Sequence, residues 1–175
     1  MKIIYYLPFT IDHFPRNSRG FTLVEMLMYM GILSILIVVM VDVFAASLDV
    51  QLESQATSAV TQDGRFLLAR LTYDVQNAQS VLVPAAVGSQ SASLQMTMNA
   101  INYTYALNNG TMQLTTNNGT DNLNGFDTTV SNLTFKRLGN GLGKDTVQVV
   151  FTLTSNVVRN TGAETKNFQT TVGLR

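Results

Sequence analysis

The sequence predicts an α+β protein in which one long N-terminal helix packs on an antiparallel β-sheet. Three observations support this fold class. Residues 26–41 form an uncharged apolar run, an apolar stripe at helical spacing continues to about residue 78, and period-two patterning rich in Asn, Thr and Val fills the remainder. Four regions follow from them: an N-terminal segment (1–20), a membrane-spanning helix (21–46), its amphipathic continuation (47–78) and a β-rich globular domain (79–175).

Composition excludes several classes of function. The chain has 175 residues, 46% of them hydrophobic and 13% charged, and its formal net charge is zero. No sequence-wide basic field therefore indicates a nucleic-acid partner. Because the chain has no cysteine, disulfide scaffolds, thiolate zinc sites and thiol nucleophiles are excluded. The only histidine is His13, and no nucleophile has a neighbouring base in sequence, so an enzyme is not expected.

The apolar N-terminal run is long enough to cross a bilayer once. As a helix, residues 21–41 would extend roughly 31 Å, which matches a hydrocarbon core. The run is too long for the apolar region of a typical signal peptide. Basic residues precede it and acidic residues follow it: Lys2, Arg16 and Arg19 before, Asp42, Asp49 and Glu53 after. The positive-inside rule therefore predicts a cytoplasmic N-terminus and an exported C-terminal domain.

The helix is predicted to continue beyond the membrane as one amphipathic segment. Its apolar positions recur at three- and four-residue steps: Leu52, Ala56, Ala59, Val60, Leu67, Leu71, Val75 and Ala78. Polar residues that include Asp63, Arg70 and Asp74 fall largely off this stripe. An interior glycine costs a helix about 1 kcal/mol relative to alanine, so a kink or short break would be expected at Asp63–Gly64.

Alternating patterns after residue 79 predict the strands of the sheet that this stripe covers. The expected strands are 80–83, 93–98, 101–107, 111–116, 130–137, 145–154 and 165–172. Asn108-Asn109-Gly110 indicates a hairpin turn, and 139–143 and 160–162 indicate further turns. Tyr103, Tyr105 and Phe135 are expected in the core or as cross-strand partners.

Glu25 is the unusual residue of the membrane segment. A charged carboxylate at the centre of a bilayer costs about 2.5–3.5 kcal/mol on insertion scales and usually has a specific partner. No basic residue lies elsewhere in the span, so an intermolecular partner is the simplest explanation. A candidate is the free amine that proteolysis before Phe21 would create.

The stretch RGFTLVEML, with the apolar helix after it, resembles the class III signal of the superfamily of type IV pilins and type II secretion pseudopilins. The resemblance implies that a membrane prepilin peptidase cleaves between Gly20 and Phe21 on the cytoplasmic side, and that Phe21 is then N-methylated. It also implies that the Glu25 carboxylate pairs with the Phe21 amine of a neighbouring subunit. Physically, two unpaired charges in an apolar setting would become one satisfied pair.

The resemblance also implies the partners and the location of the chain. The expected partners are the prepilin peptidase, other minor and major pilins or pseudopilins, the inner-membrane assembly platform and membrane lipid, with no specific nucleic acid and no cofactor. The precursor would cross the inner membrane once and later join a cell-surface or periplasmic filament. Residues 1–20 contain three of the 11 basic and one of the 11 acidic residues, so their removal would leave a formal charge of −2.

Weaker resemblances favour a minor subunit. Segments 66–81, 131–138 and 145–154 resemble parts of the J-type minor pseudopilins and of similar minor pilins. The chain lacks the cysteines that often close a C-terminal loop in major pilins, and Asp42 would fit poorly in a tightly packed filament core. These features predict a minor subunit at the filament tip. The alternatives are an adhesive or DNA-binding pilin-like subunit, or a major pilin.

The Asn/Gly-rich stretch 117–127 has the oxygen groups that calcium prefers. Its spacing departs from the calcium loop of EF-hands because Leu123 and Phe126 interrupt the alternation. A surface loop without metal is therefore the expectation.

Overall fold

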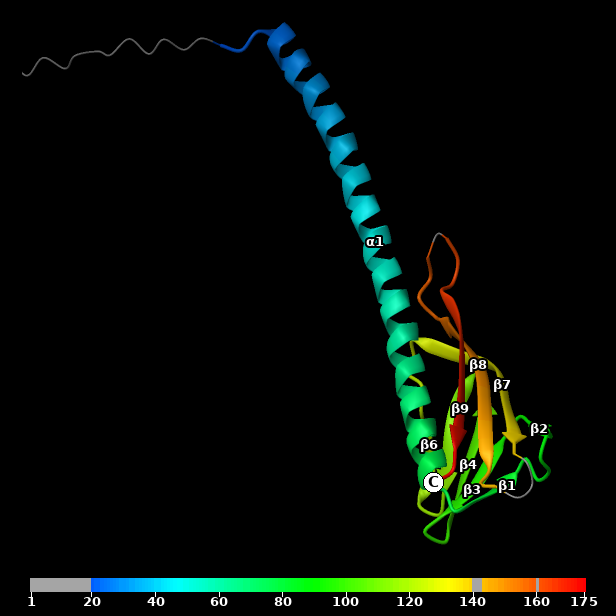
Figure 1. Cartoon of the computed structure of the whole chain (residues 1–175). Helices are drawn as coiled ribbons and strands as arrows, with labels where there is room; N and C mark the ends of the chain where they lie inside the picture. The colour runs from blue at the N-terminus through cyan, green and yellow to red at the C-terminus, as the bar shows by residue number, and fades with distance from the viewer. Residues whose placement is uncertain (1–19, 140–142, 160) are drawn as a thin grey trace, which may run out of the picture. The chain divides into compact units, whose positions relative to one another are not determined.

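The computed structural model describes residues 20–139, 143–159 and 161–175. The chain forms two compact units, Met1–Phe44 and Ala45–Arg175. Helix α1 (Leu23–Asn77) begins in the first unit and ends in the second, and strands β1 to β9 all lie in the second unit (Figure 1).

The first part of α1 has the length and composition of a membrane span. It contains an 18-residue apolar window near the N-terminus, no part of which is buried within the chain. From residue 20 to residue 51 every residue is exposed except Glu25, which is partly covered. In water such a surface would be unfavourable, so this part of the helix requires lipid or another apolar helix around it.

The second part of α1 has the predicted apolar stripe. Apart from Asp74, its buried residues are Ala56, Val60, Gly64, Leu67, Leu71 and Val75, at three- and four-residue steps, whereas Leu52 and Ala59 of the predicted stripe are half-buried. Asp74 differs from the prediction, since this carboxylate is placed off the stripe by its type but is only 1% exposed. The helix is also continuous through Gly64, so the kink or break expected there is not observed.

The β-rich unit contains two antiparallel sheets where the sequence indicated one. The five-stranded sheet has the order β1 (Ser80–Val83), β3 (Leu94–Met98), β4 (Ile101–Asn108), β5 (Thr111–Thr116) and β6 (Gly119–Asn122). The four-stranded sheet has the order β2 (Gln90–Ser91), β7 (Thr128–Leu138), β8 (Thr146–Ser155) and β9 (Thr165–Gly173). The α+β class, with a long helix packed on antiparallel sheets, is confirmed.

The two strands that the sequence did not indicate lack the alternation on which prediction depends. Strand β2 has two residues, and β6 (GTDN) contains no apolar residue and is exposed throughout. The hairpin at Asn109-Gly110 is confirmed, because both residues have the positive φ angles, 47° and 81°, of a two-residue turn of type I′. The turns expected at 139–143 and 160–162 include residues outside the described part of the chain.

Both sheets and the helix stripe share one hydrophobic core. Strand β8 alternates strictly, with Val147, Val149, Phe151 and Leu153 buried. Tyr105 and Phe135 are fully buried, as predicted, and Tyr103 packs against the core while half-buried. Side chains from α1, β3, β4, β5, β7 and β8 meet in this cluster, so the second part of the helix and the two sheets form one packed body.

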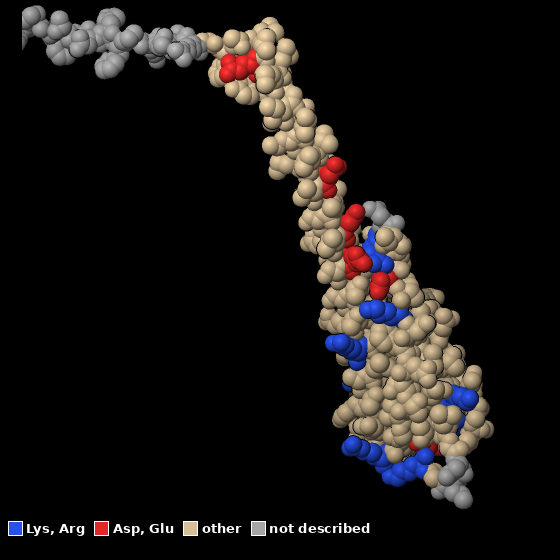
Figure 2. Space-filling model, turned by 45° about the horizontal axis from the view of Figure 1, so that its top comes forward, with Lys and Arg blue, Asp and Glu red and all other residues tan. Residues whose placement is uncertain are grey.

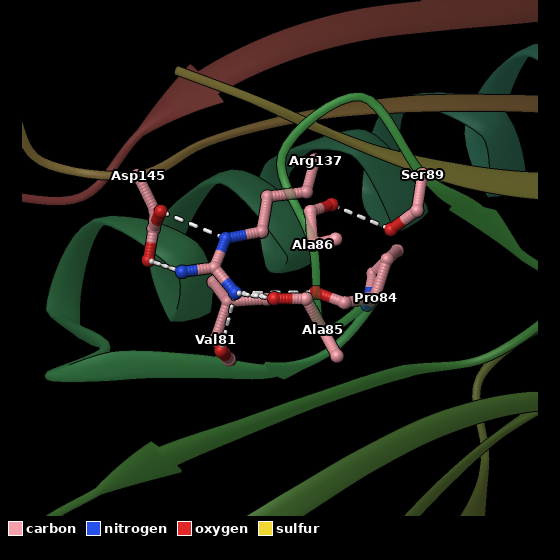
Figure 3. A network of polar contacts seen from close by, with 7 residues as sticks. All are labelled: Val81, Pro84, Ala85, Ala86, Ser89, Arg137 and Asp145. Atoms are coloured by element: carbon pink, nitrogen blue, oxygen red, sulfur yellow. Dashed lines mark hydrogen bonds and ion pairs between the residues drawn. The ribbon is translucent and has the colours of Figure 1, made fainter. Parts of the chain in front are cut away.

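Arg137 links the two sheets at one end of the unit (Figure 3). From β7, its guanidinium donates two hydrogen bonds of 2.8 Å to the carboxylate of Asp145. Its Nη1 also donates to carbonyl oxygens of β1 and of the segment after it: Val81 at 3.2 Å, Pro84 at 3.3 Å and Ala85 at 2.7 Å. One side chain therefore fixes the connection between the sheets, because its planar fork reaches several acceptors at once.

Asp74 fastens the end of α1 to the five-stranded sheet. Its Oδ2 accepts hydrogen bonds from the Tyr105 hydroxyl of β4 and, at 2.9 Å, from Nε of Arg70 one helical turn earlier. Arg70 is 41% exposed and keeps part of its hydration, whereas Asp74 and Tyr105 are buried. A buried carboxylate is tolerated here because it has two donors.

Gly64 lies where the ring of Phe168 from β9 contacts the helix. A Cβ atom at Gly64 would stand 2.1 Å from Cζ of Phe168, far inside van der Waals contact. On its other side the Phe168 ring stacks on Phe151, with ring centroids 5.4 Å apart and an interplanar angle of 17°. The glycine is therefore a requirement of packing rather than a weak point of the helix.

Gly64→Ala is expected to destabilise the β-rich unit by about 1–2 kcal/mol. Overpacking costs about 1–3 kcal/mol, and the better helix propensity of alanine returns up to about 1 kcal/mol. Pulse proteolysis of the full-length chain in detergent, over a series of urea concentrations, measures this loss.

Gly31→Ala is the matched control, because a Cβ at Gly31 meets no atom within 4 Å. Phe168→Leu in the Gly64→Ala background should recover part of the stability by making room. A Gly64→Ala chain as stable as the parent would show that the ring moves away at no cost.

Candidate functional site

Gly20 and Phe21 lie in exposed backbone directly before α1. Neither residue is helical, and Leu23 is the first residue of the helix. A Cβ atom at Gly20 would meet no other atom of the described chain within 4 Å. The peptide bond between Gly20 and Phe21 is therefore accessible, and no packing among the described residues requires glycine here, whereas close approach of the backbone to a protease cleft would.

Thr22 caps the helix. Its Oγ1 accepts a hydrogen bond of 3.2 Å from the backbone N–H of Glu25, and its carbonyl accepts one of 3.1 Å from that of Met26. Threonine followed three residues later by glutamate is the spacing of a capping box. A helix start immediately after Phe21 follows from these residues.

Glu25 lies in the first turn of the helix, where the N-terminal end of the helix dipole favours a negative charge. Its Oε1 accepts a hydrogen bond of 3.0 Å from the hydroxyl of Tyr29, one turn further along. The ring of Tyr29 also meets Phe21 edge to face, with centroids 6.2 Å apart and an interplanar angle of 76°. Phe21, Glu25 and Tyr29 therefore form one cluster on the first turns of α1.

The start of α1 brings together the residues that the sequence singled out, Gly20, Phe21 and Glu25, with Thr22 and Tyr29, which bond to Glu25. The sequence motif includes Thr22 without assigning it a role, and it does not reach Tyr29. The spacing of four between Glu25 and Tyr29 could have identified the pair, since such residues are neighbours on a helix surface. The Thr22 cap could likewise have been found from its T-x-x-E spacing.

Chemically, the cluster offers a hydrogen-bonded carboxylate close to the residue that cleavage would make N-terminal. A free amine at Phe21 would be cationic, and a carboxylate is its natural partner in a medium of low dielectric constant.

The stretch 117–127 forms β6 and a loop that side chains of this chain hold in place. Oδ2 of Asp63 on α1 accepts hydrogen bonds from the backbone N–H of Gly125, at 3.0 Å, and from the hydroxyl of Thr128. The buried side chain of Asn124 bonds to Met112 N–H and to Thr128 C=O, both at 2.8 Å. In the part of the chain that the structure describes, no three His, Cys, Asp or Glu residues gather as metal ligands.

The charges of the β-rich unit do not gather in a single basic surface on the face that Figure 2 shows. Lys and Arg side chains lie there in several separate groups, and acidic residues follow the helix. Between Val50 and Arg65, α1 has an open surface of serine and threonine hydroxyls with Glu53 and Arg65, and all the residues of this surface come from the one helix.

Comparison with known proteins identifies the N-terminal region alone. Residues 15–41 match the family model described as the prokaryotic N-terminal methylation motif, and the matched range includes Gly20, Phe21 and Glu25. No curated protein and no solved structure gives a significant match to the chain. A methylation motif of this kind is typical of prepilin-type precursors in the type IV pilin and pseudopilin class, which a prepilin peptidase processes and which assemble with other pilins. With the apolar helix, it also suits anchoring in the inner membrane.

Proposed function

We propose that the chain is the precursor of a minor pilin or pseudopilin, cleaved between Gly20 and Phe21, N-methylated at Phe21 and assembled at the tip of a type IV pilus or type II secretion pseudopilus. The observation that carries the proposal is the methylation motif over residues 15–41, which coincides with an accessible, non-helical Gly20–Phe21 bond. The N-terminus would lie in the cytoplasm and the β-rich unit outside the inner membrane, where the assembly platform would deliver the subunit to the filament.

In this proposal the Glu25 carboxylate is required for incorporation of the subunit into the filament. Its carboxylate would pair with the methylated Phe21 amine of a neighbouring subunit, because two isolated charges in an apolar medium cost more than one hydrogen-bonded pair. The N-terminal end of the α1 dipole and the Tyr29 hydroxyl both interact favourably with a carboxylate at this position. The apolar surface of the first part of α1 would then contact other helices of the filament.

The minor role has support of a different kind. It depends on the resemblances in segments 66–81, 131–138 and 145–154, on the absence of cysteine, and on the charge of Asp42 at the end of the apolar run. Asp42 is exposed on α1, so close helix packing around it would bury a carboxylate.

Glu25→Ala is expected to leave membrane insertion and cleavage unchanged and to lower incorporation into filaments by about tenfold or more, since it removes one member of a buried pair. Intact mass and N-terminal sequencing of the membrane-extracted protein measure cleavage and methylation, and the fraction of subunit in sheared filaments measures incorporation. Glu53→Ala is the matched control, because Glu53 is an exposed glutamate of the same helix beyond the apolar run.

Normal incorporation of the Glu25→Ala chain would refute the proposed role of Glu25. A wild-type chain that retains residues 1–20 in cells with an active prepilin peptidase would refute the whole proposal, because neither methylation at Phe21 nor pairing of its amine could then occur.

A second candidate, an adhesive pilin-like subunit, has one observation in its favour. Phe126 is 91% exposed and Val158 is 87% exposed, and the loops that contain them are joined by a 2.8 Å hydrogen bond from Nδ2 of Asn156 to the carbonyl of Phe126. Exposed apolar side chains on neighbouring loops are typical of contact surfaces. Loss of surface binding in Phe126→Ser filaments that assemble normally would favour this candidate.

A further inference from the structure

Tyr29 contacts both residues on which the proposed assembly depends. Its hydroxyl donates the 3.0 Å hydrogen bond to Oε1 of Glu25, and its ring packs edge to face on Phe21. Within the range 20–51, Glu25 is the one residue of intermediate rather than high exposure. Glu25 is therefore partly covered within its own subunit, before any neighbour arrives.

We propose that Tyr29 is a positioning residue for Glu25, which holds the carboxylate ready for an incoming amine while the subunit waits in the membrane. This inference depends on the proposed function of Glu25. A phenol hydroxyl suits the task because it donates a charge-assisted hydrogen bond without neutralising the carboxylate. A lysine at this position would form an ion pair and compete with the amine of the next subunit.

The ring of Tyr29 adds the second part of the argument. Its contact with Phe21 and its hydrogen bond to Glu25 are made by the same rigid side chain, so fixing one contact restricts the other. Holding a binding group in its bound conformation lowers the ordering cost that association must otherwise meet. Tyr29 thereby orders both the acceptor and the N-terminal residue of one subunit.

The first experiment tests the contact itself in a bilayer. The full-length chain, labelled with ¹³C at the phenol carbon of tyrosine, is placed in phosphatidylethanolamine–phosphatidylglycerol vesicles, and Tyr29→Phe identifies the Tyr29 resonance. Replacing Glu25 by Gln should shift that resonance, which reports on hydrogen bonding of the hydroxyl, and should leave the resonance of Tyr73 unchanged. An unshifted Tyr29 resonance would overturn the proposal, whether or not the variants are incorporated into filaments normally.

The second experiment tests the consequence in the native host. Tyr29→Phe keeps the ring and removes the hydroxyl, so cleavage and methylation should stay normal. Incorporation into sheared filaments should fall about tenfold, which corresponds to the loss of one hydrogen bond to a charged group. Tyr73→Phe, at another exposed tyrosine of α1, should assemble as the parent does.

The outcomes separate this inference from the proposed function. Normal assembly of Tyr29→Phe beside defective assembly of Glu25→Gln would overturn the role of Tyr29 and leave that of Glu25 intact. Normal assembly of Glu25→Gln would overturn the proposed function and, with it, the reason to position Glu25. Defective cleavage of Tyr29→Phe would also contradict the inference, since the tyrosine would then act on processing.

Discussion

Arg137→Met is expected to lower the free energy of unfolding of the β-rich unit by about 3 kcal/mol, the lower end of the cost of breaking a buried ion pair. The lower end applies because the side chains of Arg137 and Asp145 remain 19% and 18% exposed. Methionine fills much of the same volume but has no donor, so the Asp145 carboxylate loses both of its 2.8 Å hydrogen bonds. The carbonyls of Val81, Pro84 and Ala85 lose a donor at the same time.

Pulse proteolysis in urea of the full-length chain in detergent measures the loss. Lys136→Met is the matched control, because it removes the same charge from the adjacent position of β7, which faces the other side of the sheet.

Arg137→Lys should recover little, because an ammonium group cannot form two parallel hydrogen bonds with a carboxylate. A chain with Arg137→Met and Asp145→Leu together should be more stable than Arg137→Met alone, since no unpaired charge then remains. Equal stability of Arg137→Met and the Lys136→Met control would contradict the stabilising role given to Arg137.

Tyr105→Phe is expected to cost about 2–3 kcal/mol, because it leaves the buried Asp74 carboxylate with one donor fewer. Oδ1 of Asp74 is already buried without a hydrogen-bond partner among the described residues. In the variant, the hydrogen bond from Arg70 would therefore be the remaining one to this carboxylate. Asp74→Leu should cost about 2 kcal/mol by stranding the Tyr105 hydroxyl. The double variant should be more stable than the sum of the two losses predicts, because both ends of the interaction have gone.

The same tyrosine predicts a dependence on pH. Burial, together with the hydrogen bond to Asp74, raises the pKa of Tyr105 above its ordinary value of about 10. A raised pKa in the folded state means that the stabilisation is complete below pH about 10 and is lost as the pH rises above it, when the unfolded state releases the proton more readily. Urea unfolding at alkaline pH should show this loss in the parent chain.

The loss above pH about 10 should be smaller in the chain with both Asp74→Leu and Tyr105→Phe, which has no buried hydroxyl at this position. Tyr103→Phe is the control, because Tyr103 lies on the same strand but is only half-buried. An equal alkaline loss in the double variant and in the parent would show that Tyr105 is not its cause.

By itself the sequence determined the features that depend on neighbouring residues. The apolar run, the stripe of α1, seven strands and the Asn109-Gly110 hairpin follow from periodicity and turn chemistry, which act within a few residues. The motif with Gly20, Phe21 and Glu25 is local in the same sense. The helix cap at Thr22 is also local, because its T-x-x-E spacing lies within four residues.

Tertiary structure decided the rest, because the interactions join residues that are far apart in the sequence. The sequence predicted a break in the helix at Gly64, whereas the structure shows a continuous helix with Phe168 packed against that glycine. The sequence placed Asp74 off the apolar stripe, whereas the structure shows it buried and bonded to the Tyr105 hydroxyl. The division of the strands into two sheets depends on pairings, such as β2 with β7, that alternation within one strand does not encode. A periodic pattern reports which face of an element is buried, whereas only the folded chain shows which partner buries it.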